Sequence, residues 1–380
     1  MSQADHKPDR RQPAVPIPLT LLTGFLGAGK TTLLNRLLKD PALTDTAVII
    51  NEFGEVSLDH LLVDYIGDNM VLLQSGCLCC TLRGDLVDGL EKLLRDLDNG
   101  RCQFRRVLLE TTGLADPAPV LQTAMAHPYL VKRFRLDGVV TVVDAVNGES
   151  TLDGYPEAVK QAAVADRIVL TKTDLADAEQ RAGIVGRLHA LNPAATILDA
   201  AKGEATADRL LNCGLYDPSR KIPDVKKWLA AEAYAEAQEH GHGHHDHRHH
   251  DVNRHHDHIA SFVLTADKPI PAGTLDMFLE LLRASHGAKL LRVKGIVQLA
   301  EMPDNPVVVH GVQHVFHPTA RLERWPDDDH RSRLVFITRD LPERTVRELF
   351  EAFIGVASPD RPDRAALTDN PLIPFGGIDR

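Results

Sequence analysis

The chain of 380 residues lacks any long apolar run and any excess of positive charge. No stretch approaches the roughly 18 uninterrupted apolar residues that a membrane helix needs. Lys and Arg number 43 against 53 Asp and Glu, a net charge of −10 with no basic stripe, so we expect no nucleic-acid partner. The first apolar run, LTLLTGFLGAG, lacks the small-residue cleavage pattern of a signal peptide. These absences predict a soluble, cytoplasmic protein with no membrane partner.

Cysteine is also scarce. Only five residues are cysteine, an odd number, and Cys77, Cys79 and Cys80 fall within four positions. This spacing is a poor disulfide framework and fits a reducing compartment in which thiolates serve as metal ligands. The apolar content of 43% and the charged content of 25% are those of a globular protein, and the length suffices for two domains.

The first half of the sequence alternates short apolar runs with amphipathic stretches. Near-continuous hydrophobic strands separated by helices predict an α/β fold with a mostly parallel sheet flanked by helices, in which ligands bind at the carboxyl ends of the strands. The strands are expected at 18–25, 46–53, 70–74, 105–112, 138–145, 167–172 and 195–200. Helices are expected at 31–40, 85–97, 156–164 and 178–191.

The composition changes after about residue 215. A helical pattern at 226–239 leads into a His-rich stretch, and beyond it strands at 259–266, 289–300, 306–318 and 333–339 and helices at 274–285 and 343–353 suggest a small α+β domain. We therefore expect five parts: a disordered tail (1–16), an α/β domain (17–215), a helix and His-rich linker (216–258), an α+β domain (259–356) and a second tail (357–380).

A phosphate-binding loop follows the first strand. GFLGAGKT matches G-x-x-x-x-G-K-[ST] after a strand and before a helix, as the motif requires. Glycines let backbone N–H groups approach phosphate oxygens, and the helix N-terminus favours negative charge. Lys30 is predicted to reach the β- and γ-phosphates and Thr31 to bind Mg²⁺. The expected nucleotide contacts are Gly24, Gly27, Ala28, Gly29, Lys30, Thr31 and Thr32; a glycine-rich turn with a chance lysine is the alternative.

Two further strand ends are candidates for the hydrolysis site. RRVLLETTG places Glu110 three residues before Gly113, where P-loop enzymes carry an acidic residue near Mg²⁺. We expect Glu110 to reach the ion through water; a merely solvated carboxylate is the alternative. NEFGEVSLD, at 51–59, is the candidate switch that senses the γ-phosphate.

TKTD, at 171–174, favours guanine as the base. The stem of Lys172 can lie along the ring, and Asp174 can accept hydrogen bonds from N1 and N2 of guanine, a donor pair that adenine lacks. Guanine motifs usually carry Asn where Thr171 stands, so one supporting hydrogen bond is expected to be lost or replaced.

The three clustered cysteines point to a soft metal ion. Thiolates suit Zn²⁺, Co²⁺ or Cu⁺, and three of them leave a tetrahedral site one ligand short, which permits transfer. An extended chain would put Cys77 and Cys79 on one side and Cys80 on the other, so convergence of all three requires a turn. A redox thiol pair and structural cysteines are the alternatives.

Taken together, these motifs resemble those of the CobW-type family of metal-handling P-loop GTPases. The likeness is carried by GFLGAGKTT, NEFGEVSLD, GCLCCTLRGDL, LLETTGLADP, VVTVVDA, TKTD and the His-rich stretch. It implies that a metal binds the Cys-x-Cys-Cys loop when GTP and Mg²⁺ order the switches and is released to a client after hydrolysis. Carried across by motif, the functional residues are Lys30 and Thr31 for phosphate and Mg²⁺, Glu110 in the second acidic motif, and Cys77, Cys79 and Cys80 for Zn²⁺ or Co²⁺.

The His-rich stretch is interpreted as a weak metal-gathering arm, because imidazoles in such a segment offer many interchangeable arrangements. A solvated linker is the alternative. The arm comprises His240, His242, His244, His245, His247, His249, His250, His255, His256 and His258. His310, His314 and His317 alternate with apolar residues and are expected to be structural.

The leading hypothesis is a slow GTPase that delivers a transition metal, foremost Zn²⁺, to a client protein. The alternatives are a metal buffer regulated by nucleotide and a maturation factor for one cobalt-, iron- or nickel-dependent enzyme. The sequence leaves the client, the cellular metal and the oligomeric state open.

Overall fold

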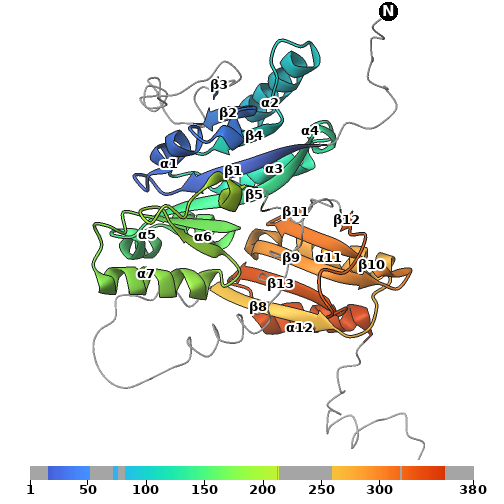
Figure 1. Cartoon of the computed structure of the whole chain (residues 1–380). Coiled ribbons are helices and arrows are strands. Elements are labelled where there is room, and N and C mark those ends of the chain that lie inside the picture. The colour runs from blue at the N-terminus through green and yellow to red at the C-terminus, as the bar shows by residue number, and fades with distance from the viewer. Residues whose placement is uncertain are drawn as a thin grey trace, which may run out of the picture.

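The computed structural model describes residues 16–51, 72–75, 82–211, 213, 259–316 and 319–355. Within these ranges the chain forms two β-sheets, each with its own helices (Figure 1). No helix in the described ranges is both long and apolar enough to cross a membrane.

The first sheet has seven strands in the order β3-β2-β4-β1-β5-β6-β7, and every neighbouring pair is parallel. The predicted parallel α/β fold is confirmed. The strands are β1 (Ile17–Gly24), β2 (Thr46–Asn51), β3 (Leu72–Ser75), β4 (Arg106–Glu110), β5 (Phe134–Asp144), β6 (Arg167–Thr171) and β7 (Thr196–Asp199).

Both faces of this sheet are buried, which explains the near-continuous apolar strands. Leu21 and Leu109 belong to the core under α2 and α3, whereas Leu22 and Leu108 belong to the core under α1. A third core joins β5 and β6 to α5, α6 and α7. The helices are α1 (Lys30–Leu37), α2 (Leu82–Asp98), α3 (Pro117–Ala126), α4 (Leu130–Arg133), α5 (Gly148–Gly154), α6 (Pro156–Ala163), α7 (Ala178–Leu191) and α8 (Ala207–Leu210).

Most predicted elements are present, with different ends in places. β5 begins at Phe134 rather than at residue 138. α3, α4, α5 and α8 were not predicted. α4 and α8 have only four residues each, and α5 carries two glycines, so their helical pattern is weak in the sequence. The predicted helix at 226–239 lies outside the described residues.

The second sheet is antiparallel and confirms the predicted small α+β domain. Its strand order is β11-β10-β9-β13-β8, with β12 paired to β10. The elements are β8 (Ile259–Ala266), α11 (Ala272–His286), β9 (Leu290–Leu299), β10 (Met302–Val312), β11 (Val315–Phe316), β12 (Ala320–Arg321), β13 (Ser332–Arg339) and α12 (Glu343–Ile354).

One predicted strand of this domain is a hairpin instead. The sequence at 306–318 divides into β10 and β11 at a turn in which Gln313 has a positive φ of 52°. His310 is half-buried on β10 and His314 is exposed in the turn, while His317 lies outside the described residues. The expected structural role therefore fits the position of His310 better than that of His314.

The two faces of the second sheet have different partners. One face packs on α11 and α12, where the rings of Phe278 and Phe350 lie 5.1 Å apart. The other face meets the first domain: Leu291 and Ile337 form a small core with Ala163 at the end of α6. The first domain and the α+β domain are therefore joined by a packed interface (Figure 1).

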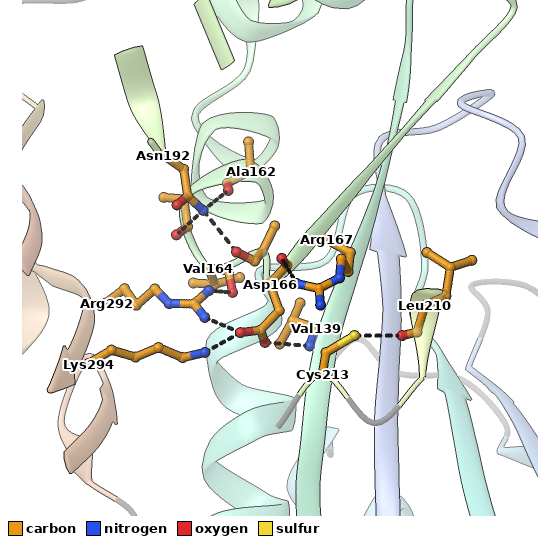
Figure 2. Close-up of polar contacts among 12 residues, drawn as sticks. Val139, Ala162, Val164, Asp166, Arg167, Asn192, Leu210, Cys213, Arg292 and Lys294 are labelled. Atoms are coloured by element: carbon orange, nitrogen blue, oxygen red, sulfur yellow. Dashed lines mark hydrogen bonds and ion pairs between the residues drawn. The ribbon is translucent and has the colours of Figure 1, made fainter. Parts of the chain in front are cut away.

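A buried ion cluster lies in this interface. Asp166 pairs with both Arg292 and Lys294 of β9, and all three side chains are at most 6% exposed (Figure 2). Burial alone would raise the pKa of Asp166, but the charges of Arg292, Lys294 and His310 hold that pKa far below its usual value. Burial lowers the pKa of Lys294 to about 8.

The first prediction concerns Asp166→Asn. Removing the carboxylate leaves two buried cations without their counter-charge, so the free energy of unfolding should fall by about 3 kcal/mol. Because the folded-state pKa lies below the unfolded value, the contribution of Asp166 is complete above about pH 4 and is lost as the pH falls. Denaturant titration at several pH values measures both effects.

Asp98→Asn is the matched control for this prediction, because Asp98 pairs with Arg133 at a partly exposed site with an N–O distance of 2.7 Å. Loss of the Asp98–Arg133 pair should lower the free energy of unfolding by less than about 1 kcal/mol. An equal fall in the free energy of unfolding in the two variants would contradict the larger contribution expected of the buried cluster.

Candidate functional site

The loop between β1 and α1 can take its shape only because glycine occupies three positions. Gly24, Gly27 and Gly29 have φ values of 141°, 74° and 95°. A Cβ at Gly24 would lie 2.3 Å from the carbonyl oxygen of Val142 on the neighbouring β5, whereas one at Gly27 would meet nothing within 4 Å. The loop is thus pressed against β5 at its start and open at its middle, where backbone groups can approach a phosphate.

Lys30, Thr31 and Glu110 come together beside this loop. Lys30 is buried at the start of α1, and its Nζ donates to the Phe25 carbonyl at 3.2 Å. Thr31 Oγ1 donates to Glu110 Oε1 at 3.2 Å, because β4 lies next to β1 and brings the two strand ends together. A hydroxyl and a carboxylate are the hard oxygen ligands that Mg²⁺ prefers, so these residues fit the expected ion. Thr32 is exposed in the first turn of α1.

The loop after Glu110 packs directly against the phosphate loop. We call residues 113–116 the Gly113 loop. A Cβ at Gly113 would lie 2.5 Å from the backbone nitrogen of Leu26. Just before it, Thr111 Oγ1 donates to Thr23 Oγ1 at 2.8 Å. A displacement of either loop must therefore move the other.

The Thr171 hydroxyl contacts the phosphate loop and the end of β5. Its oxygen lies 2.7 Å from the Ala28 carbonyl oxygen and 3.2 Å from that of Val143. The end of β6 is thereby fastened to the phosphate loop.

Lys172 is held by a carboxylate that the sequence reasoning did not select. Its backbone has a positive φ of 56°, and its Nζ donates to Asp144 Oδ2 at 2.7 Å. Burial favours a higher pKa for Asp144, but hydrogen bonds from Lys172, Asn147 and the backbone of Val146 hold that pKa below its usual value. The position of Asp144 after VVTVV, at the end of a buried strand, was the available signal. Asp174 is exposed at the same rim.

The loop after β7 also reaches the TKTD segment and was missed. Thr173 Oγ1 donates to Asp199 Oδ1 at 2.6 Å, and the same oxygen accepts from the backbone of Ala201 and Lys202. Small residues following a strand end, in DAAKG, were the signal. A cavity of about 240 Å³ lies nearby, lined among others by Phe25, Ala28, Asp144, Gln161 and Lys172.

The predicted transition-metal residues lie outside the described residues. This applies to Cys77, Cys79 and Cys80 and to all ten histidines of the arm. β3 ends at Ser75, two residues before Cys77, at the carboxyl edge that also carries Glu110. In the described part of the chain no group of three or more His, Cys, Asp or Glu side chains could hold a metal ion.

Two domain families match the chain. The nucleotide-binding domain of CobW, HypB and UreG matches residues 18–199, and the C-terminal domain of the cobalamin synthesis protein CobW matches residues 259–354. These two matches correspond to the two sheets of the structure.

Named relatives cover almost the full length. The zinc chaperone YjiA of Escherichia coli is 35% identical over 336 residues, which are 88% of this chain and 98% of YjiA. The crystal structure of Zn(II)-bound YjiA GTPase from E. coli has a TM-score of 0.65 at 33% identity, covering 89% of this chain and 99% of that one. A YjiA triple mutant, in which one glutamate and two cysteines are replaced by alanine, is also Zn(II)-bound; it has a TM-score of 0.65 at 32% identity, with coverage of 89% and 99%.

The second prediction concerns Thr171. Thr171→Val keeps the shape but leaves the Ala28 carbonyl without its donor, so affinity for GDP should weaken by about tenfold. Thr171→Asn restores a donor at this position and should bind GDP within about threefold of the native chain. Calorimetric titration measures both. Native affinity in Thr171→Val would show that the hydroxyl does not support the nucleotide site.

Proposed function

The chain belongs to the CobW/HypB/UreG family of nucleotide-binding proteins, and from this membership we propose that it couples GTP hydrolysis to the delivery of a transition metal, foremost Zn²⁺. It is a GTPase, as its named relatives are. The metal is the cargo, bound by Cys77, Cys79 and Cys80 and passed to a client protein. The observation that supports this proposal best is the shared sheet edge: the Cys-x-Cys-Cys loop follows β3 where the phosphate loop follows β1 and Glu110 ends β4.

Hydrolysis requires charge stabilisation around the γ-phosphate. Lys30, at the start of α1, is the group that contacts the β- and γ-phosphates, and it leaves its present contact with the Phe25 carbonyl to do so. Thr31 and Glu110 are the residues that would hold Mg²⁺, and the ion would supply positive charge to stabilise the transferring phosphoryl group. The sequence offers no arginine finger, so turnover should be slow, below about 1 s⁻¹ as in unassisted switch GTPases.

Guanine selection depends on TKTD. Asp144 fixes the Nζ of Lys172 and so limits the positions of its stem, while Asp174, exposed at the rim, is available to the N1 and N2 donors of the base. Thr171 keeps this segment attached to the phosphate loop. These contacts support GTP as the substrate rather than ATP.

Coupling between the two sites follows from the strand order. Neighbouring strands lie about 4.8 Å apart, so β3 is roughly 10 Å from β4 and roughly 14 Å from β1. β2 lies between β3 and β4, and NEFGEVSLD begins at its last residue, Asn51. The candidate switch NEFGEVSLD therefore begins on a strand that lies between the strand before the cysteines and the strand that ends at Glu110. Delivery then requires that the GTP-bound loop bind the metal more tightly than the GDP-bound loop.

The His-rich arm is proposed to gather metal rather than to hold it tightly. Its ten imidazoles outnumber the ligands of any single site, and neutral imidazole binds Zn²⁺, Ni²⁺ and Co²⁺. Loss of the arm should therefore lower the metal stoichiometry while sparing the tight site.

The third prediction is a nucleotide-dependent affinity for zinc. A competing chelator should report binding at least about tenfold tighter with a non-hydrolysable GTP analogue than with GDP, a coupling of the usual allosteric size. Since YjiA is Zn(II)-bound even with two cysteines replaced, zinc binding by itself is not diagnostic, and the difference between nucleotides is the readout.

Cys79→Ala should abolish this difference, and Cys102→Ala, a half-buried cysteine elsewhere in the chain, should keep it. Equal zinc affinities with both nucleotides in the native chain would contradict delivery and favour a metal buffer. A difference that survives Cys79→Ala would contradict the assignment of the cysteines.

The fourth prediction concerns Glu110→Gln. The amide keeps the shape but removes the charge that would favour Mg²⁺, so kcat for GTP should fall by about a hundredfold. Affinity for GDP without Mg²⁺ should change little. The control is Glu149→Gln, which alters an exposed carboxylate on α5 and should leave kcat unchanged. A native kcat in Glu110→Gln would exclude Glu110 from the magnesium site.

A further inference from the structure

A single buried glutamine on α6 holds the Gly113 loop. Gln161 Nε2 donates to the Gly113 carbonyl at 3.1 Å and to the Ala115 carbonyl at 3.0 Å, and its side chain is almost wholly buried. Two carbonyl oxygens can be satisfied only by the NH₂ end of the amide, so the orientation of this side chain is fixed by its partners. The preceding residue contributes a third contact, because Lys160 Nζ lies 2.6 Å from Asp116 Oδ2. Two successive residues of α6 therefore fix both ends of the loop.

The Gly113 loop is confined on its other side by the phosphate loop. Gly113 is so close to the backbone of Leu26 that even a methyl group would collide with it. Gln161 lines the same cavity as Phe25 and Ala28 of the phosphate loop. The loop thus lies between Leu26 and α6, and a change in the phosphate loop bears directly on Gln161.

The C-terminal end of α6 lies within one helical turn of Gln161. It is held by Asn192 of the first domain and by Arg292 of the C-terminal domain. The Asn192 amide donates to the carbonyls of Ala162, Ala163 and Ala165 at 2.9, 3.1 and 2.9 Å, which holds this end of the helix in place (Figure 2). Arg292 of β9 reaches across and donates to the Val164 carbonyl while it also pairs with Asp166.

Apolar packing reinforces this attachment. Ala163, the last residue of α6, forms a buried core with Leu291 on β9 and Ile337 on β13. Polar and apolar contacts therefore converge on the same helix end. A shift of α6 along its axis cannot occur without a shift of β9.

We propose that Gln161 is a positioning residue for GTP hydrolysis and that α6 transmits the state of the Gly113 loop to β9 of the C-terminal domain. Gln161 acts through its hydrogen bonds to the loop. In one direction, loss of the γ-phosphate changes the Gly113 loop, and α6 carries the change to β9. In the other direction, the C-terminal domain restrains the loop on which hydrolysis depends. This inference uses only the GTPase activity and is independent of where the transition metal binds.

The test uses the full chain with Gln161→Met, which keeps the length and removes both donors. The kcat for GTP should fall by about tenfold, because the loop is misplaced, while affinity for GDP changes by less than about twofold. The matched control is Gln180→Met, which breaks the exposed capping box of α7 and so lowers stability without touching the loop. An unchanged kcat in Gln161→Met, or an equal fall in Gln180→Met, would overturn the positioning role.

Transmission through α6 to the C-terminal domain is tested by amide hydrogen exchange. Amide hydrogen exchange in residues 290–294 of β9 should differ between the complexes with GDP and with a non-hydrolysable GTP analogue, and this difference should disappear in Gln161→Met. A native chain with the same exchange in both complexes, or a difference that persists in the variant, would overturn transmission through α6.

Lys160→Met keeps the test decisive should the buried variant fail to fold, because the Lys160–Asp116 pair is partly exposed, at 19% and 26%. It should lower kcat by about threefold and reduce the exchange difference in β9, as expected from loss of one of three contacts to the loop. Native values of both quantities would contradict the proposal. No transition metal is present in these experiments, so their failure would leave the metal-delivery proposal standing, and the reverse also holds.

Discussion

The structure depends on close backbone contacts around the phosphate loop. Val142 lies where a side chain at Gly24 would be, Leu26 lies where one at Gly113 would be, and the Ala28 carbonyl accepts from Thr171. The loops after β1 and β4 therefore pack closely against each other and against the ends of β5 and β6. Close-packed interiors move between discrete arrangements rather than deforming smoothly, so a ligand that alters one of these loops alters its neighbours. This constraint is the physical basis of the proposed coupling between the nucleotide and a metal at the same sheet edge.

The C-terminal domain shares in this constraint because it is not a loosely tethered unit. Its sheet uses one face for its own helices and the other for α6 and the neighbouring segment, where Asp166, Arg292 and Lys294 form a buried ion cluster. A buried cluster of this kind favours one docking geometry, since any other would leave charges without partners. The same domain is present in CobW relatives, and here its attachment point is one turn away from the residue that holds the Gly113 loop.

Local patterns revealed the fold and part of the site. The phosphate loop, Glu110 and TKTD could be found because each motif lies in one short segment, and the parallel sheet followed from apolar strands buried on both faces. The contacts of Gln161 could not be found, because its partners are backbone carbonyls 46 and 48 residues away. Asp166 is similarly hidden, since Arg292 and Lys294 lie 126 and 128 residues further on. Such pairs depend on how the elements pack, which residue type and periodicity do not encode.

In the proposed function, the nucleotide and the transition metal share one coupled equilibrium, and thermodynamic linkage makes this coupling measurable. If the GTP-bound state binds Zn²⁺ more tightly by some factor, Zn²⁺ must tighten binding of a GTP analogue by the same factor. The measurement is the Kd of a non-hydrolysable GTP analogue in the presence of Mg²⁺, with and without saturating Zn²⁺, and the Kd of GDP under the same conditions. We expect Zn²⁺ to tighten binding of the analogue relative to that of GDP by about tenfold. An analogue-to-GDP affinity ratio unchanged by Zn²⁺ would contradict it.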